Sequence, residues 1–163
     1  MREIAPMFTF FRRPKPSDVS RDFAEASVRY WLSKYGFKCA TVERDGIDFL
    51  AKNLKTNDLL GISVRSIIQA ELSADQQVAI SLSEISKARS ACSTFNCIPY
   101  FAFQVYQEQQ TFLFLMSIEH FFAIQPKDNR DVRFVLTEQA IDQYVADPKI
   151  LSIETNHKIW RWF

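Results

Sequence analysis

Hydrophobic residues follow two different periods along this chain, and the periods separate helices from strands. Apolar side chains at steps of three and four residues predict a helix that is capped by Ser17 and ends at Gly36. The same spacing predicts a second helix over 82–95 and a third from Thr137 to about 146. The apolar stripe of the first helix, of the kind that packs on a core, consists of Val19, Phe23, Ala26, Tyr30, Trp31 and Tyr35.

Three short segments after the first helix have the composition of β-strands. They cover 37–43, 47–52 and 59–67, and short polar turns separate them. The first turn contains Asp45-Gly46, a strong β-hairpin signal. Because the connections are short, we expect the three strands to form an antiparallel meander.

Two later segments are nearly continuous apolar runs, over 98–106 and 112–116. Such runs are typical of strands that are buried on both faces. A short strand is expected over 132–136, whereas 68–81 have no clear pattern and no element is assigned to the tail from 150 onwards.

The order of these elements predicts an α/β domain with a mixed β-sheet flanked by helices. A chain of 163 residues has the usual length of a single domain. Within it we distinguish a basic and aromatic arm over 1–16, a core over 17–118, and an α/β extension over 119–163 that packs on the core.

Charge is distributed unevenly along the chain although the net charge is only +1. Residues 1–40 carry eight Lys and Arg against four Asp and Glu, whereas 41–163 carry twelve against fifteen. The basic excess begins at Arg12, Arg13 and Lys15, which would contact nucleic-acid phosphates or form a solvated tail.

Other features narrow the class of protein. Three scattered cysteines without a signal-peptide pattern predict free thiols and a cytoplasmic location, and no apolar run is long enough for a membrane helix. His120 and His157 have no neighbours at zinc-ligand spacing, and glycine-rich phosphate loops do not occur.

One group of residues in the meander has the chemistry of a site. Asp48 follows the hairpin turn in the second strand, and Ser63-Val64-Arg65 lie in the third. Since side chains alternate along a strand, Ser63 and Arg65 share a face, where Asp48 can lie beside them. Glu25 on the first helix could reach the same pocket.

At these residues the chain resembles the PD-(D/E)XK nuclease superfamily, and most closely its Holliday junction resolvase-like and Mrr-like members. The resemblance covers about 17–118 and implies a restriction endonuclease-like three-layer α/β/α core. It also implies a bound Mg²⁺ that polarises the scissile phosphate, with Asp48 as a ligand and Glu25 as an auxiliary one. The matching segments are Phe23-Ala24-Glu25-Ala26, Asp45-Gly46-Ile47-Asp48-Phe49-Leu50, Ile62-Ser63-Val64-Arg65-Ser66, 82–95 and Pro99-Tyr100-Phe101-Ala102-Phe103.

The chain departs from that superfamily at two positions. Ser63 stands where the pattern has Asp or Glu, and Arg65 stands where it has Lys. A serine hydroxyl is a weaker ligand for a hard cation, and arginine cannot act as a base, although it can stabilise phosphate charge. The acid and the lysine could come from elsewhere: Glu84 or Glu71 for the acid, and Lys87 or Lys52 for the lysine.

Glu84 and Lys87 are the preferred substitutes because they share one face of the second predicted helix, with Glu84 as a further metal ligand. Ordinary surface ion pairs have the same spacing. The site is therefore either moved onto this helix or lost.

These observations lead to a functional hypothesis with two alternatives. We expect a nuclease-like protein that binds DNA, with Mg²⁺-dependent phosphodiester hydrolysis of endonuclease or resolvase type. The first alternative is an inactive relative that serves as a DNA-binding or assembly module, with Arg65 contacting phosphates. The second alternative is a domain that binds only proteins.

Both ends of the chain mix aromatic and basic residues. Such segments can stack on bases, but they are also typical of protein interfaces, and we therefore expect a homodimer. The two segments are Phe10-Phe11-Arg12-Arg13 and Trp160-Arg161-Trp162-Phe163.

Overall fold

The computed structural model describes residues 16–71 and 74–157. The basic positions Arg12, Arg13 and Lys15, and the aromatic segments at both ends, lie outside the described residues. The elements in chain order are α1 (Pro16–Lys34), β1 (Phe37–Arg44), β2 (Ile47–Asn53), β3 (Leu59–Ile68), the 3₁₀ turn η1 (Gln69–Glu71), β4 (Gln77–Ser81), α2 (Leu82–Phe95), β5 (Ile98–Tyr106), β6 (Gln110–Ser117), α3 (Ile118–Ile124), β7 (Asp131–Val135), α4 (Glu138–Ala146) and β8 (Leu151–Asn156).

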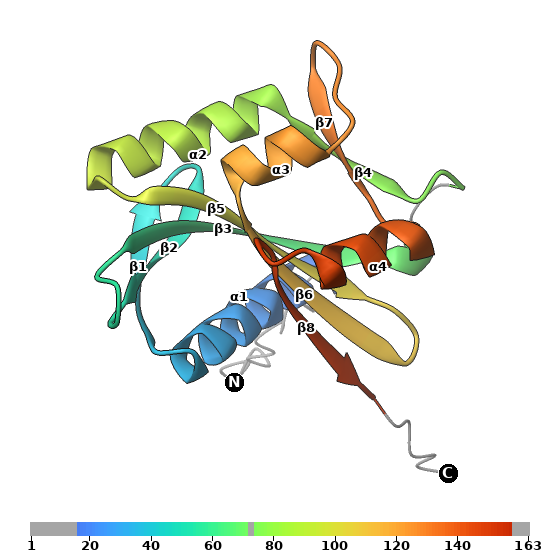
Figure 1. Ribbon diagram of the computed structural model, residues 1–163, viewed down its shortest axis with the longest axis horizontal. Helices are drawn as coiled ribbons and strands as arrows, with labels where there is room; N and C mark the ends of the chain where they lie inside the picture. Colours follow the sequence, from blue (N-terminus) through green and yellow to red (C-terminus); the bar gives the residue numbers. More distant parts are fainter. Residues whose placement is uncertain (1–15, 72–73, 158–163) are drawn as a thin grey trace, which may run out of the picture.

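A six-stranded sheet with the order β1-β2-β3-β5-β6-β8 forms the middle layer (Figure 1). β1, β2 and β3 form the antiparallel meander that the sequence predicts. β3 and β5 pair in parallel at the centre, with Leu60 opposite Ile98 and Ile68 opposite Tyr106. β5, β6 and β8 then continue in antiparallel pairs. The sheet is mixed, as expected.

Helices cover both faces of this sheet (Figure 1). α1 packs on one face, where Ala24, Val28 and Leu32 contact the side chains of Phe49 and Ile62. The opposite face carries α2, α3, α4 and the two-stranded β4-β7 sheet. The three-layer α/β/α arrangement predicted from the sequence is therefore confirmed.

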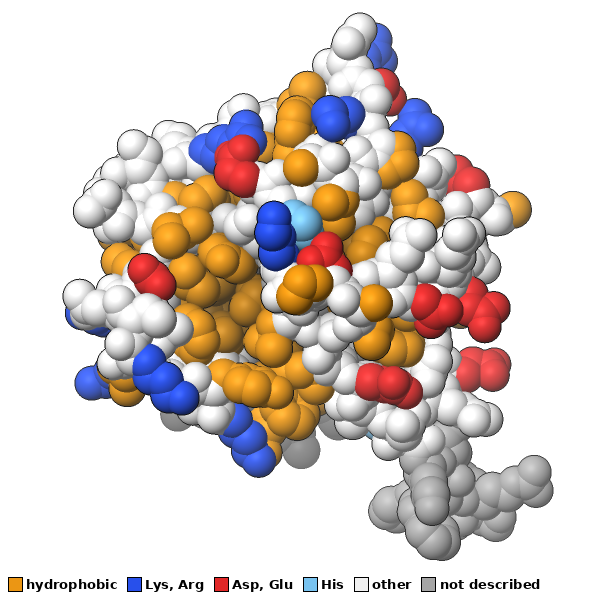
Figure 2. All heavy atoms as spheres, in the orientation of Figure 1, with side chains coloured by type: hydrophobic (Ala, Val, Ile, Leu, Met, Phe, Trp, Pro, Cys, Tyr) orange, Lys and Arg blue, Asp and Glu red, His pale blue; other side chains and the backbone are white. Residues whose placement is uncertain are grey.

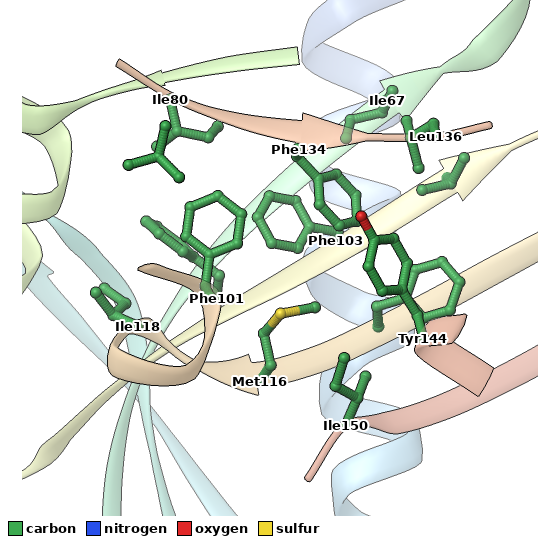
Figure 3. Close-up of a cluster of buried hydrophobic side chains, with 14 of the residues drawn as sticks. Ile67, Ile80, Phe101, Phe103, Met116, Ile118, Phe134, Leu136, Tyr144 and Ile150 are labelled. Carbon is green, nitrogen blue, oxygen red and sulfur yellow. The ribbon is translucent and has the colours of Figure 1, made fainter. Parts of the chain in front are cut away.

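The larger core lies under α2, α3 and α4 and is built from aromatic rings (Figure 3). Phe134 stacks on Phe103 with ring centroids 3.9 Å apart and on Tyr144 at 5.3 Å. Phe101 and Phe121 meet edge to face beside them. These buried rings fix the sheet against the layer that carries α2.

The apolar stripe predicted for α1 is largely on the wrong face, although one of its members, Trp31, packs partly buried against the core. Phe23, Tyr30 and Tyr35 are 58%, 53% and 50% exposed, whereas the buried positions are those of the contacts named above. Residues spaced by four define that buried stripe equally well. Its small and medium side chains allow the helix to approach the sheet closely, which bulky aromatic rings would prevent.

Four elements were not expected from the sequence: η1 and β4 in the ambiguous segment, α3, and β8 in the tail. α3 begins at once after β6, because the Ser117 hydroxyl accepts a hydrogen bond from the backbone N–H of His120 and caps the helix. β8 pairs with β6 along Gln110–Leu115, so part of the predicted extension belongs to the main sheet.

Candidate functional site

The β1–β2 hairpin is held against α2 by a glycine. Gly46 has a φ of +104°, which side-chain-bearing residues rarely adopt. A Cβ at this position would lie 2.5 Å from the backbone carbonyl carbon of Lys87. The Asp45-Gly46 turn therefore brings the start of β2 against α2, and this contact positions Asp48 near the helix.

Asp48 lies where β2 and β3 separate. Their backbone pairing runs from Lys52 opposite Leu59 to Phe49 opposite Ile62. Beyond this pair, Oδ2 of Asp48 accepts a hydrogen bond of 2.7 Å from the backbone N–H of Val64. The carboxylate, whose side chain is only 13% exposed, thus replaces a strand as the partner of this amide.

α1 contributes a guanidinium to the same place. Nη2 of Arg21 lies 2.8 Å from Oδ1 of Asp48, and Nε of Arg21 donates to Oε1 of Glu25 at 3.3 Å. The hydrogen bond to Asp48, together with its charge, raises the pKa of Arg21 above its ordinary value. Because Arg21 contacts both carboxylates, it connects Glu25 to Asp48. The other carboxylate oxygen of Glu25 lies 3.6 Å from Arg29.

β3 contributes Ser63 and Arg65, which share a face as the alternation predicts. Ser63 is buried, and Nη2 of Arg65 lies 2.7 Å from Oε1 of Glu84 on α2. Oε2 of Glu84 accepts hydrogen bonds from the backbone N–H and the hydroxyl of Ser81, which in turn caps α2. Glu84 thus joins the site to the first turn of α2.

The charge state of Glu84 follows from these contacts. Burial opposes its ionisation, but the hydrogen bonds from Ser81 and the charges of Arg65 and Lys87 outweigh burial and lower its pKa. Glu84 is therefore an anion at neutral pH.

These side chains surround one hollow of about 300 Å³ between the hairpin, β3 and the start of α2. Lys87 lines it and pairs with Asp45 at 3.0 Å. Five of the six predicted catalytic residues line the hollow, and the sixth, Glu25, contacts it through Arg21. The lining residues are Arg21, Arg44, Asp45, Gly46, Ile47, Asp48, Ser63, Arg65, Glu84 and Lys87.

Two arginines of the hollow were not identified as site residues from the sequence. Arg21 pairs with a carboxylate 27 positions away, and Arg44 donates to the hydroxyl of Thr94 on α2. The spacing of Arg21 and Glu25, four residues apart on a helix, is the only sequence signal for either. Of the alternative substitutes, Lys52 lies at the opposite end of the β2–β3 pairing, beside Leu59.

The carboxylates do not converge on one point. Within residues 16–71 and 74–157, no group of three or more His, Cys, Asp or Glu side chains could hold a metal ion. Asp48, Glu25 and Glu84 are each paired with an arginine instead. As arranged, this donor set does not fit a bound Mg²⁺.

Each of the two histidines lies close to one polar side chain. His120 pairs with Asp147 at 2.7 Å, and His157 lies 2.7 Å from the Thr111 hydroxyl. No helix in the described part of the chain is long and apolar enough to cross a membrane.

Comparisons with known proteins identify the fold. The sequence matches no protein-family model, and no curated protein sequence is similar to it. The structure is similar to Archaeoglobus fulgidus Hjc, a Holliday junction resolvase from an archaeal hyperthermophile, with a TM-score of 0.51 and 16% sequence identity. The match covers 72% of this chain and 91% of that chain. This likeness shows the restriction endonuclease-like fold that the sequence predicts.

Proposed function

We propose that this chain is a nuclease-like protein that binds DNA at the hollow around Asp48. The observation that supports the proposal is the convergence of Asp48, Ser63, Arg65, Glu84 and Lys87 in one hollow. The sequence pattern alone predicts these five residues as site residues. Their convergence occurs in a fold shared with a Holliday junction resolvase.

The charges around the hollow favour a polyanion as the ligand. Arg21, Arg44, Arg65 and Lys87 line it against three carboxylates. Arginine donors match the geometry of phosphate oxygens. Arg12, Arg13 and Lys15 precede α1 in the sequence and lie outside the described residues, and contact of these residues with DNA phosphates stays a prediction from sequence.

A different side of the molecule is unsuitable for DNA. A second hollow, of about 510 Å³, is lined by Glu138 and Asp142 of α4 and by Glu154 of β8. Figure 2 shows acidic side chains gathered on that side. DNA would be repelled there, so the two hollows predict a binding orientation.

Fluorescence anisotropy with labelled duplex and four-way-junction DNA tests this proposal. We expect binding that weakens steeply with salt, and weaker binding by Lys87→Gln and Arg44→Gln. Arg89→Gln is the matched control, because Arg89 is also partly exposed and pairs with Glu119 on a surface away from the hollow. Absence of DNA binding at low salt, or equal weakening by the control, would contradict the proposal.

Mg²⁺-dependent phosphodiester hydrolysis is the second candidate function. Asp48 and Glu84 line the same hollow together with Lys87, but they could hold Mg²⁺ only after the arginines that pair with them had moved away. Incubation of supercoiled plasmid with the protein and Mg²⁺ or Mn²⁺ tests it. Cleavage by the wild type that is lost in Asp48→Asn would support hydrolysis, and no cleavage by the wild type would remove it while leaving DNA binding intact.

Self-association and compartment complete the proposal. We infer a homodimer, and the exposed residues Phe23 and Tyr30 on α1, with Tyr35 directly after the helix, favour such contacts. Figure 2 shows further hydrophobic side chains gathered on one face. Sedimentation velocity at several protein concentrations tests the dimer. A cytoplasmic location stays our prediction, in keeping with the free Cys39, Cys92 and Cys97.

A further inference from the structure

We propose that Arg21 and Arg65 take the role of a divalent cation in the hollow, so that the site binds a DNA phosphate without divalent metal. This inference rests on the proposed DNA binding and specifies how the same hollow performs it. Four observations carry it: the occupied carboxylate oxygens, the charge balance, the remaining arginine donors, and the neutral residue between them.

Both carboxylate oxygens of Asp48 already have partners. Oδ1 of Asp48 contacts Arg21 at 2.8 Å, and Oδ2 accepts from the backbone N–H of Val64 at 2.7 Å. Mg²⁺ and Mn²⁺ need several unengaged oxygen ligands at close range. A cation here would have to compete with the charge-assisted hydrogen bonds that Asp48 already accepts.

Glu84 and Glu25 are occupied in the same way. Oε1 of Glu84 lies 2.7 Å from Arg65, while Oε2 accepts from the backbone N–H and hydroxyl of Ser81. Glu25 uses Oε1 for Arg21 and Oε2 for Arg29. The carboxylates therefore serve to hold arginines in place.

The charge balance of the hollow favours an anion. Its lining contains four cationic side chains and three carboxylates, Asp45, Asp48 and Glu84. A divalent cation would add to an existing positive excess, whereas a phosphodiester group with a single negative charge would neutralise it. Ser63, which is buried between these groups, adds no negative charge.

The arginines have donors left for a ligand. Arg21 uses Nε and Nη2 for its two carboxylates, so further N–H groups remain on its guanidinium. Nε of Arg65 is buried and has no hydrogen-bond partner among the described residues. An unpaired buried donor on a charged group is costly, and a shift of the Arg65 side chain toward a phosphate oxygen in the hollow would satisfy it.

The experiment separates metal binding from DNA binding. DNA affinity is measured by anisotropy in EDTA and in Mg²⁺ at matched ionic strength, and Mn²⁺ binding to the protein alone is measured by electron paramagnetic resonance. We expect the two DNA affinities to agree within about twofold and the wild type to leave the signal of free Mn²⁺ unchanged.

Two double variants test whether the arginines prevent metal binding at the carboxylates. Arg21→Gln/Arg65→Gln removes both guanidiniums, so the released oxygens of Asp48 and Glu84 should bind Mn²⁺ and lower the free Mn²⁺ signal, which the wild type leaves unchanged, while DNA binding weakens. Arg89→Gln/Arg133→Gln is the control, because it releases Glu119 and Asp128, which lie away from the hollow. Circular dichroism checks that both double variants fold. Arg65→Lys keeps the positive charge but not the planar guanidinium donors, and it should also weaken DNA binding.

Each outcome has one meaning. Mn²⁺ binding by the wild type, or DNA binding that requires Mg²⁺, would overturn this inference and leave the proposed function standing. DNA binding that Arg65→Lys and the double variant leave unchanged would also overturn it. Absence of DNA binding in both buffers would overturn the proposed function, and with it the phosphate part of the inference.

Discussion

Replacing Asp48 by alanine and by asparagine separates two contributions of its carboxylate: the hydrogen bond that it accepts from Val64 and its negative charge. The carboxylate accepts the backbone N–H of Val64 at the point where the β2–β3 pairing ends. Alanine leaves that partly buried amide without an acceptor. Asparagine has nearly the same shape and keeps one carbonyl oxygen that can accept the same hydrogen bond.

The two contacts of Asp48 contribute very different free energies. Loss of a hydrogen bond to a charged group, with a partly buried donor left unsatisfied, costs about 2 kcal/mol. The ion pair with Arg21 adds little, because the Arg21 side chain is 64% exposed and solvent screens the charge. We therefore expect Asp48→Ala to lower the free energy of unfolding by about 2 kcal/mol, and Asp48→Asn by less than about 1 kcal/mol.

Urea denaturation monitored by tryptophan fluorescence measures this difference, and thermal melts should show a loss of about 4–8 °C in Tm for Asp48→Ala. Asp45→Ala is the control, since Asp45 is 78% exposed and makes only a surface ion pair with Lys87. Equal losses for the alanine and asparagine variants at position 48 would show that charge, not the bond to Val64, carries the stability, and would refute this reasoning.

Three further predictions concern the scaffold of the site and the core. Gly46→Ala should lower the free energy of unfolding by about 3 kcal/mol, because the added Cβ would collide with the α2 backbone. Gly36→Ala is the control, since Gly36 also has a positive φ but open space around it, and it should lower the free energy of unfolding by about 1 kcal/mol. Similar urea midpoints for the two variants would be inconsistent with the contact between Gly46 and α2. The pKa of Glu84 lies below its ordinary value of 4.5, so its contribution to stability is complete above that pH and is lost as the pH falls through the lower folded value. The difference in Tm between wild type and Glu84→Gln should therefore shrink on acidification below about pH 4.5, and a constant difference would count against the assignment. Phe134→Ala should cost about 4 kcal/mol in calorimetry, against less than about 1 kcal/mol for the exposed Phe23→Ala.

The part of the site that sequence could predict depends on short-range geometry. Ser63 and Arg65 share a face because strand side chains alternate, and Glu84 and Lys87 share a face because they lie three apart on a helix. The hairpin turn before Asp48 fixes the start of β2. Each of these rules acts within a few residues, so each transfers directly from sequence to structure.

The remaining features depend on how distant segments pack. Arg21 meets Asp48 only because of the angle at which α1 crosses the sheet, and no local pattern specifies that angle. The sequence did not identify the buried face of α1 for the same reason. Apolar residues recur at helical spacing both in the stripe that contains Phe23 and in the stripe that contains Ala24, and only the packing decides between the two. β8 has a polar second half, and it forms a strand because β6 offers an unpaired edge.

The parallel pairing of β3 with β5 has a consequence for the order in which the chain folds. The antiparallel pairs β1-β2, β2-β3 and β5-β6 join strands that are close in sequence, and such hairpins form in microseconds. The parallel pair β3-β5 forms later, because the chain between these strands, which includes α2, must first bring their ends together. Asp48 belongs to the first of these rapid units and Glu84 to the crossover. A nascent or half-folded chain therefore has no assembled hollow around Asp48, and the hollow is complete only once the slow central pairing of β3 with β5 has formed.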